Sequence, residues 1–327
     1  MLNVTELHQA IKSCYEARIP LLIRGGPGIA KTDIVNQIAQ EYAVDFAPFN
    51  AGTMDPSSFG ITIPRADNSA CDIIPTAEFV DVKPGGIVFL DEMDKLDTLI
   101  QNAMLPMIQN NRINGRELSD RWHVMAANRM SDGKGTFEIS SILRNRVCVV
   151  DFEGPTIQEW TTHASKCGID YRVISFLNQP QYMNLLNAYD PKADSSPTPR
   201  QWFKVSRIID SPVRNYLCFG LVGAKATAEF EVFMKITSKL PSWAALVSSN
   251  GNFKVPDEFV LQSILATMIG QNMDGTTAKA VKPVIDQLPV EFIVVALRLA
   301  VNRNAAGIQQ FIVTNNYVPM MHKAMTS

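Results

Sequence analysis

The chain has 327 residues, of which 46% are hydrophobic and 19% charged, and a formal net charge of −2. This length suffices for two or three domains, and the composition is typical of a soluble globular protein. The near-neutral charge argues against broad nucleic-acid binding, although a local basic patch stays compatible with it. No secretory signal is evident at the N-terminus, and the apolar stretch 292–301 is too short to span a bilayer. Five cysteines without a C-x-x-C pair fit reduced thiols and no zinc site, so we expect a cytoplasmic protein.

The first elements lead into a glycine-rich loop. Apolar residues recur at helical spacing in 4–17, which predicts a helix with one buried face. An apolar strand follows from residue 20 to 24, and the spacing in 32–42 predicts a second helix. A glycine loop between a strand and a helix wraps its backbone N–H groups around phosphate oxygens, next to the positive end of the helix. The segment therefore predicts a site for a nucleoside triphosphate.

Each position of this loop is a candidate for nucleotide binding: Gly25, Gly26, Pro27, Gly28, Ile29, Ala30, Lys31 and Thr32. Gly26 and Gly28 are expected to allow close backbone approach and left-handed turns. Lys31 would reach the β and γ phosphates, and Thr32 would offer its hydroxyl to Mg²⁺. The usual pattern has glycine at the position of Ala30, so we expect Ala30 to have a negative φ. An ordinary strand, turn and helix is the competing interpretation.

Two adjacent acids end the next strong strand. A weaker strand is predicted near 45–50, and 52–75 reads as a loop or insertion with short helical pieces. The apolar run 87–90 predicts a buried parallel strand that delivers Asp91 and Glu92 to its carboxyl end. Asp91 would hold Mg²⁺, and Glu92 would polarise the water that attacks the γ phosphate. Alternatively, both acids are a solvated strand end.

A polar amide follows a further buried strand. The stripe from 96 to 108 predicts a helix that packs on the sheet, and Pro106 should kink it or end it early. A hairpin is predicted at 111–118, with Asn-Gly at its turn. The strand 122–127 then delivers Asn128 to the same edge as the acids. Its amide would orient the attacking water or contact the γ phosphate, unless it is a simple strand-end cap.

Three arginines are candidate catalytic residues. Arg144 and Arg146 directly precede a predicted strand at 147–152. In a P-loop ATPase that assembles as a ring, an arginine at this position projects into the nucleotide of the neighbouring subunit, whereas the ordinary interpretation is a surface ion pair. Arg200 lies in the first turn of a helix that two prolines introduce, where a cation is unfavourable unless an anion is near. We therefore expect Arg200 to contact the γ phosphate.

The order of these motifs resembles that of AAA+ ATPases: the glycine loop G-G-P-G-I-A-K-T, the strand I-V-F-L-D-E, Asn128, L-R-N-R and T-P-R-Q-W. The chain also resembles the MoxR-like branch of that family, in P-G-x-A-K-T, K-P-G-G and D-P-S-S-F-G. The resemblance covers roughly residues 1–210. It implies an α/β P-loop NTPase with a parallel five-stranded sheet as nucleotide-binding core (1–152) and a helical lid (153–215), and the mostly helical remainder (216–327) is interpreted as a C-terminal extension. Arg146 matches the family's arginine finger best, and Arg144 is the second candidate.

The resemblance also implies a function. Proteins of this branch use Mg²⁺ and ATP, form a ring, usually a hexamer, and remodel or mature a partner protein, often one with a von Willebrand factor A domain. ATP rather than GTP is inherited from the resemblance, and the guanine motif N-K-x-D is not seen at the expected strand. Phe59 and Gly60 are the nearest candidates for a substrate-threading loop.

Two alternatives remain open. The first is an AAA+ motor or loader that acts on nucleic acid, for which Arg112, Arg116 and Arg121 around the predicted hairpin would supply the contacts. Solvated hairpin residues are the ordinary interpretation of these arginines. The second is a nucleotide-gated scaffold that hydrolyses little, against which the water-activating Glu92 argues.

Overall fold

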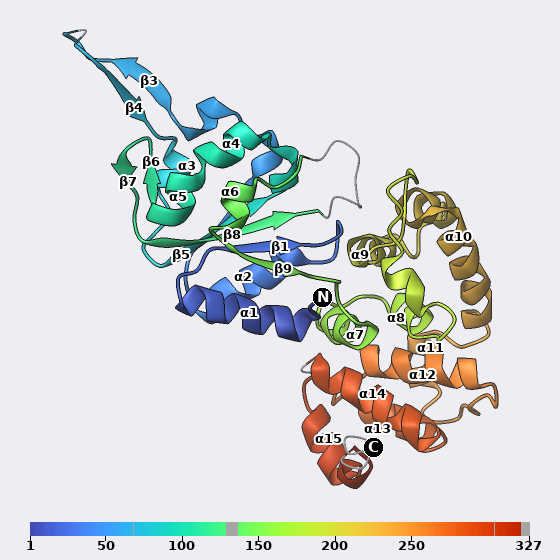
Figure 1. Cartoon of the computed structure of the whole chain (residues 1–327). Helices are drawn as coiled ribbons and strands as arrows, with labels where there is room; N and C mark the ends of the chain where they lie inside the picture. The colour runs from blue at the N-terminus through green and yellow to red at the C-terminus, as the bar shows by residue number, and fades with distance from the viewer. Residues whose placement is uncertain (68, 129–136, 304, 322–327) are drawn as a thin grey trace. The chain divides into compact units, whose positions relative to one another are not determined.

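The structure, a computed structural model, describes residues 1–67, 69–128, 137–303 and 305–321 and divides into two compact units, Met1–Pro155 and Thr156–Ser327. The first unit contains a five-stranded parallel sheet in the order β2-β5-β8-β1-β9 (Figure 1). Its strands are β1 (Leu21–Arg24), β2 (Phe46–Asn50), β5 (Gly86–Asp91), β8 (Arg121–Ala127) and β9 (Cys148–Asp151). The predicted parallel five-stranded sheet is therefore confirmed.

Helices cover both faces of this sheet. One face carries α1 (Val4–Glu16) and α2 (Lys31–Glu41), and the other carries α4 (Thr98–Ala103), α5 (Leu105–Asn110) and α6 (Ser141–Arg144), with α3 (Ala77–Val80) nearby (Figure 1). Because successive strand residues point to opposite faces, Leu21 and Ile23 join the first layer of core while Leu22 joins the second. The three inner strands β5, β8 and β1 are buried on both faces, which explains why they are largely apolar.

The helix predicted over 96–108 is two helices. They meet at Met104, two residues before Pro106, which has no N–H and whose ring clashes with the preceding turn. Leu99, expected in the buried stripe, is 80% exposed, so that part of the prediction is wrong.

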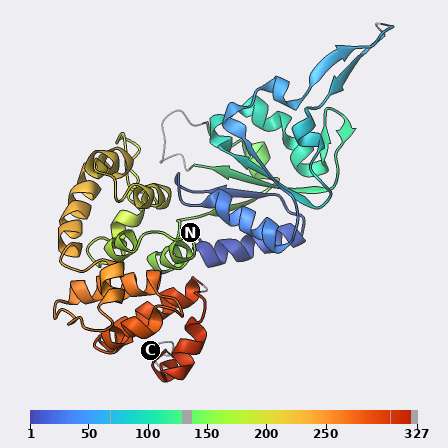
Figure 2. The ribbon, with the colours of Figure 1, turned by 180° about the vertical axis from the view of Figure 1, so that it is seen from behind.

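Two hairpins branch from the first unit. The predicted one is confirmed: β6 (Arg112–Ile113) and β7 (Arg116–Glu117) are joined by Asn114 and Gly115, whose φ angles of 49° and 81° suit a tight turn. The segment 52–75 is only partly as expected. Besides the 3₁₀ turns Ala51–Thr53 and Pro56–Phe59, it contains an antiparallel hairpin of β3 (Ile61–Pro64) and β4 (Cys71–Ile74). This second hairpin extends away from the rest of its unit (Figure 1, Figure 2).

The second unit is helical. Its elements are α7 (Ile157–Lys166), α8 (Tyr171–Leu177), a 3₁₀ turn (Met183–Asn187), α9 (Pro199–Arg207), α10 (Arg214–Thr237), α11 (Trp243–Ser248), α12 (Phe259–Asn272), α13 (Ala278–Ile285), α14 (Val290–Asn302) and α15 (Ile308–Thr314). Across the described residues, no helix has the length and apolar character needed to cross a bilayer.

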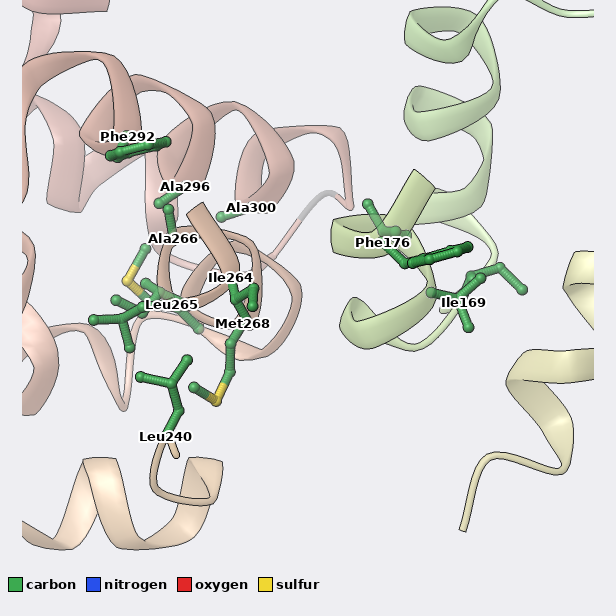
Figure 3. Packing of buried hydrophobic residues seen from close by; sticks show 14 of the residues in the cluster. Ile169, Phe176, Leu240, Ile264, Leu265, Ala266, Met268, Phe292, Ala296 and Ala300 are labelled. Carbon is green, nitrogen blue, oxygen red and sulfur yellow. The ribbon is translucent and has the colours of Figure 1, made fainter. Parts of the chain in front are cut away.

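One hydrophobic cluster, which runs from Trp160 to Tyr317, fills the second unit. Figure 3 shows part of it, including Phe176 of α8 and the facing alanines of α12 and α14, Ala266 and Ala296. Residues of both the predicted lid (153–215) and the predicted extension (216–327) contribute to this cluster. The division into lid and extension stays a prediction.

Candidate functional site

The glycine loop follows the carboxyl end of β1 and closes around the Lys31 side chain. Lys31 Nζ donates to the carbonyl oxygens of Gly25 and Gly26, both at 2.8 Å. Gly28 has a φ of 70°, as a left-handed turn requires. The close approach occurs at Gly25, where a Cβ would lie 2.6 Å from the Phe152 carbonyl oxygen. Gly26 does not have the positive φ expected of it, and a Cβ there would meet no described atom within 4 Å. The expected close approach of Gly26 and Gly28 to phosphate stays a prediction.

Ala30 has a left-handed backbone, with φ 75° and ψ 24°. The expectation of a negative φ at this position is therefore wrong. The chain must reverse here before it enters α2, whose first turn begins with the Ile34 N–H donating to the Ala30 carbonyl at 3.1 Å. A left-handed conformation costs an alanine about 1–2 kcal/mol. The geometry of the loop thus overrides the backbone preference of the residue.

The two acids lie at the same edge of the sheet as the loop. Thr32 Oγ1 donates to Asp91 Oδ2 at 3.3 Å, which joins the start of α2 to the end of β5. Glu92, the next residue, has a φ of 58°, and its N–H donates to Asp91 Oδ1 at 2.9 Å. Its carboxylate lies over Gly52, because a Cβ at Gly52 would be 2.8 Å from Glu92 Oε2. Thr32, Asp91 and Glu92, predicted separately from three motifs, are thus neighbours.

Asn128 directly follows β8, the strand between β5 and β1. Its backbone N–H donates to Asp94 Oδ1 at 3.0 Å, and its Nδ2 donates to Asp94 Oδ2 at 3.2 Å. Asp94 is only 2% exposed, and sequence reasoning missed it. The available signal was its position three residues after Asp91, but an acid there is ordinarily assigned to the surface.

A family model identifies this unit. Residues 21–147 match the model of the AAA family, "ATPase family associated with various cellular activities (AAA)". This segment is an AAA ATPase domain. The chain is accordingly an ATP-hydrolysing enzyme of the P-loop class, and the match includes the loop, both acids and Asn128.

The comparisons with whole proteins are more distant. No curated protein matches the sequence. Among solved structures, the chain is similar to the RuvB Holliday junction branch migration motor of Thermotoga maritima, with 15% identity, 75% of this chain and 74% of that chain covered, and a TM-score of 0.41. It is also similar to NtrX from Brucella abortus in complex with ADP, with 17% identity, coverage of 72% and 67%, and a TM-score of 0.38. Likenesses this distant carry no information on activity.

Both finger candidates of the AAA domain are exposed near the amino end of β9. Arg144 forms an ion pair with Glu138 at 3.1 Å, and Arg146 Nη1 donates to the Ile142 carbonyl at 3.0 Å. Arg200 belongs to the second unit, where it is exposed in the first turn of α9 behind the N-cap Thr198. The roles of these three arginines stay predictions.

Two expectations about the AAA domain's surface are wrong. Arg121, expected to face nucleic acid, is 3% exposed, and its guanidinium donates to the carbonyl of Phe79. Phe59, the threading candidate, is 7% exposed and stacks on Phe79 with ring centroids 5.9 Å apart. Both side chains serve the core, because Phe79 of α3 reaches them from a segment distant in sequence. Arg112, another arginine of that set, is paired with Glu117 at 2.7 Å.

The second unit contains a cavity of about 660 Å³ at the ends of α9, α12 and α14. Its lining includes Asp170, Arg207, Gln271 and Arg303, and none of the predicted site residues. Arg303 Nη2 donates to the Met273 carbonyl at 2.8 Å, and burial lowers the pKa of Arg303.

Proposed function

We propose that this chain is a Mg-ATP-dependent AAA+ motor of the MoxR-like type, which forms a ring and uses hydrolysis to remodel or mature a partner protein. The glycine loop holds the phosphates, with Lys31 exchanging its two backbone carbonyls for phosphate oxygens. Glu92 polarises the attacking water, and Asn128 orients it. The left-handed backbone of Glu92 supports this assignment, since strain in a non-glycine residue is often retained at functional sites.

Thr32 and Asp91 fit a magnesium site. A hydroxyl and a carboxylate oxygen 3.3 Å apart are the hard oxygen donors that Mg²⁺ prefers, and such sites take their other ligands from phosphate and water. A bound Mg²⁺ would neutralise charge that develops on the phosphate oxygens. Asp91 and Thr32 would fix the position of the ion, because Asp91 lies at the end of β5 and Thr32 at the start of α2.

The geometry of β9 supports a ring in which Arg146 acts on a neighbouring subunit. β9 runs parallel to β1, with Cys148 opposite Leu21 and Asp151 opposite Arg24. The glycine loop begins after Arg24, whereas Arg146 precedes Cys148. At about 3.3 Å per residue the two lie more than about 10 Å apart along the strands, at opposite ends. Arg146 is therefore poorly placed for its own nucleotide and free to serve another. A hexamer is the ring size that the AAA+ resemblance favours.

The observation that favours a protein partner is the β3–β4 hairpin. Ile61, Ile63, Ile73 and Ile74 are 64%, 45%, 43% and 49% exposed. An isolated two-stranded hairpin is only marginally stable in water, and large exposed apolar side chains mark contact sites. These side chains suit an apolar polypeptide segment, of the kind a partner such as a von Willebrand factor A domain protein would present, rather than phosphates.

The ring is tested by ATPase rate against protein concentration. We expect activity to rise with assembly, to vanish in Glu92→Gln, and to return in part when Arg146→Ala is mixed with Lys31→Ala, since each variant supplies what the other lacks. Activity that is independent of concentration, with Arg146→Ala at the wild-type rate, would refute the shared site.

The partner class is tested by stimulation of the ATPase. A permanently unfolded, reduced and carboxymethylated polypeptide should stimulate the wild type, and the Ile61→Ser, Ile74→Ser double variant should lose this effect. Val232→Ser, at a residue of α10 that is 52% exposed, is the matched control. Stimulation by oligonucleotides that falls steeply with salt would instead support the nucleic-acid alternative.

A further inference from the structure

Asp94 is a buried carboxylate whose side-chain hydrogen bonds to described residues both go to Asn128. The residue lies in the 3₁₀ turn Met93–Lys95, between Met93 and Leu96, which are 0% and 2% exposed. Burying a carboxylate is costly unless its oxygens are hydrogen-bonded. One oxygen accepts from the Asn128 backbone N–H and the other from its side-chain Nδ2. The buried carboxylate of Asp94 therefore holds Asn128, the residue that follows β8.

This pair of bonds fixes which way the Asn128 amide faces. An ionised carboxylate only accepts hydrogen bonds, so the amide nitrogen must be the atom that faces Asp94. The backbone bond holds the other carboxylate oxygen in place, which keeps Asp94 from rotating. Oδ1 of Asn128 is then directed away from Asp94. This oxygen is an acceptor only.

We propose that Asp94 is a positioning residue that makes Asn128 an acceptor for the attacking water, not a donor to the γ phosphate. The inference rests on the proposed role of this site in hydrolysis. A water that donates one proton toward Glu92 and the other toward Asn128 Oδ1 turns a lone pair toward the phosphorus. The Gly25 N–H donates to the Ala127 carbonyl at 3.1 Å, which ties the strand that carries Asn128 to the phosphate loop.

Asp94→Asn separates this role from a structural one. In the variant the new amide keeps its oxygen on the Asn128 N–H and offers its nitrogen to the Asn128 side chain. That side chain satisfies the bond by turning its own oxygen inward, which leaves Nδ2 facing the site. Every hydrogen bond is retained, so we expect thermal unfolding and the KM for ATP to stay near wild type. We expect kcat to fall about 10²-fold, the loss typical of a misplaced reacting group.

The exchange of the two residues is the decisive variant. In Asp94→Asn combined with Asn128→Asp, the carboxylate at 128 accepts from the amide at 94 and still directs an acceptor oxygen at the water. We expect kcat to rise at least about tenfold above that of Asp94→Asn, with a higher KM because the negative charge lies nearer the phosphates. If Asn128 acts as a donor to the γ phosphate, the exchange places a carboxylate there and kcat stays at or below that of the single variants.

Controls keep the outcomes distinct. Asp97→Asn is matched, because Asp97 caps α4 by accepting from the Ile100 N–H at 3.0 Å and asparagine caps equally well. It should leave kcat unchanged. If Glu92→Gln abolishes turnover while Asp94→Asn keeps the wild-type rate, the positioning role of Asp94 is refuted and the proposed function stands. Absence of turnover in the wild-type ring would remove the proposed function and this role with it.

Discussion

Ala30→Gly tests whether the phosphate loop is strained. Ala30 has φ 75° and ψ 24°, which costs an L-residue about 1–2 kcal/mol and costs glycine almost nothing. Glycine also gains about 0.4–1 kcal/mol of conformational freedom in the unfolded chain, which opposes the gain. The net expectation is a stabilisation of the first unit by about 0.5–1 kcal/mol, or about 1–4 °C in Tm.

The measurement is urea and thermal unfolding of the variant beside two matched alanine variants of the same unit. Ala43 follows the end of α2 with a φ of 52°, so Ala43→Gly should also stabilise. Ala10 lies inside α1, where Ala10→Gly should cost about 1 kcal/mol. ATP affinity should change little in Ala30→Gly, because residue 30 offers the site its backbone and not its methyl group.

A destabilisation of Ala30→Gly similar to that of Ala10→Gly would refute the left-handed loop. It would mean that Ala30 has an ordinary helical backbone in solution. A stabilisation by Ala43→Gly in the same experiment would show that unfolding measurements detect the strain of a left-handed alanine.

Three further predictions concern His123, Phe59 and Gly52. Burial lowers the pKa of His123 to about 3, so the imidazole stays neutral in the folded protein, whereas in the unfolded chain it binds a proton below a pKa of about 6.5. The free energy of unfolding should therefore fall by about 2 kcal/mol between pH 7 and pH 5, and His123→Leu should remove that part of the pH dependence. Phe59→Ala should cost about 3 kcal/mol in unfolding free energy through its stacking on Phe79, and ATP turnover unchanged below the unfolding temperature would separate this from a catalytic effect. Gly52→Ala should lower kcat, because its Cβ would lie 2.8 Å from Glu92 Oε2 and 3.1 Å from Lys95 Cβ, so the carboxylate must move; an unchanged kcat would contradict the proposed role of that carboxylate.

The middle of the central sheet was predictable because its inner strands β5, β8 and β1 are buried on both faces. Runs such as 87–90 and 122–127 need no alternation, and each ends in polar residues that mark the edge where a ligand binds. Both acids and Asn128 were found from this rule, whereas the loop was found from its glycines followed by Lys31 and Thr32.

What escaped prediction depends on contacts between distant segments. Arg121 reads as a surface cation, yet carbonyls of Phe79 and Val82 satisfy its guanidinium inside the core. Asp94 has no apolar or glycine signal to distinguish it, and only the folding of β8 beside its turn brings Asn128 to it. The β3–β4 hairpin was missed because its strands are exposed on both faces, so burial imposes no two-residue period on them.

The shared core of the second unit joins the predicted lid to the predicted extension. Phe176 of α8 and Trp202 of α9 pack on Phe230 of α10, with ring centroids 5.1 and 5.9 Å apart. The rings therefore connect the predicted lid, which contains α8 and α9, to α10 of the predicted extension. Cutting the chain at residue 215 would remove Phe230 and leave Phe176 and Trp202 without that packing partner.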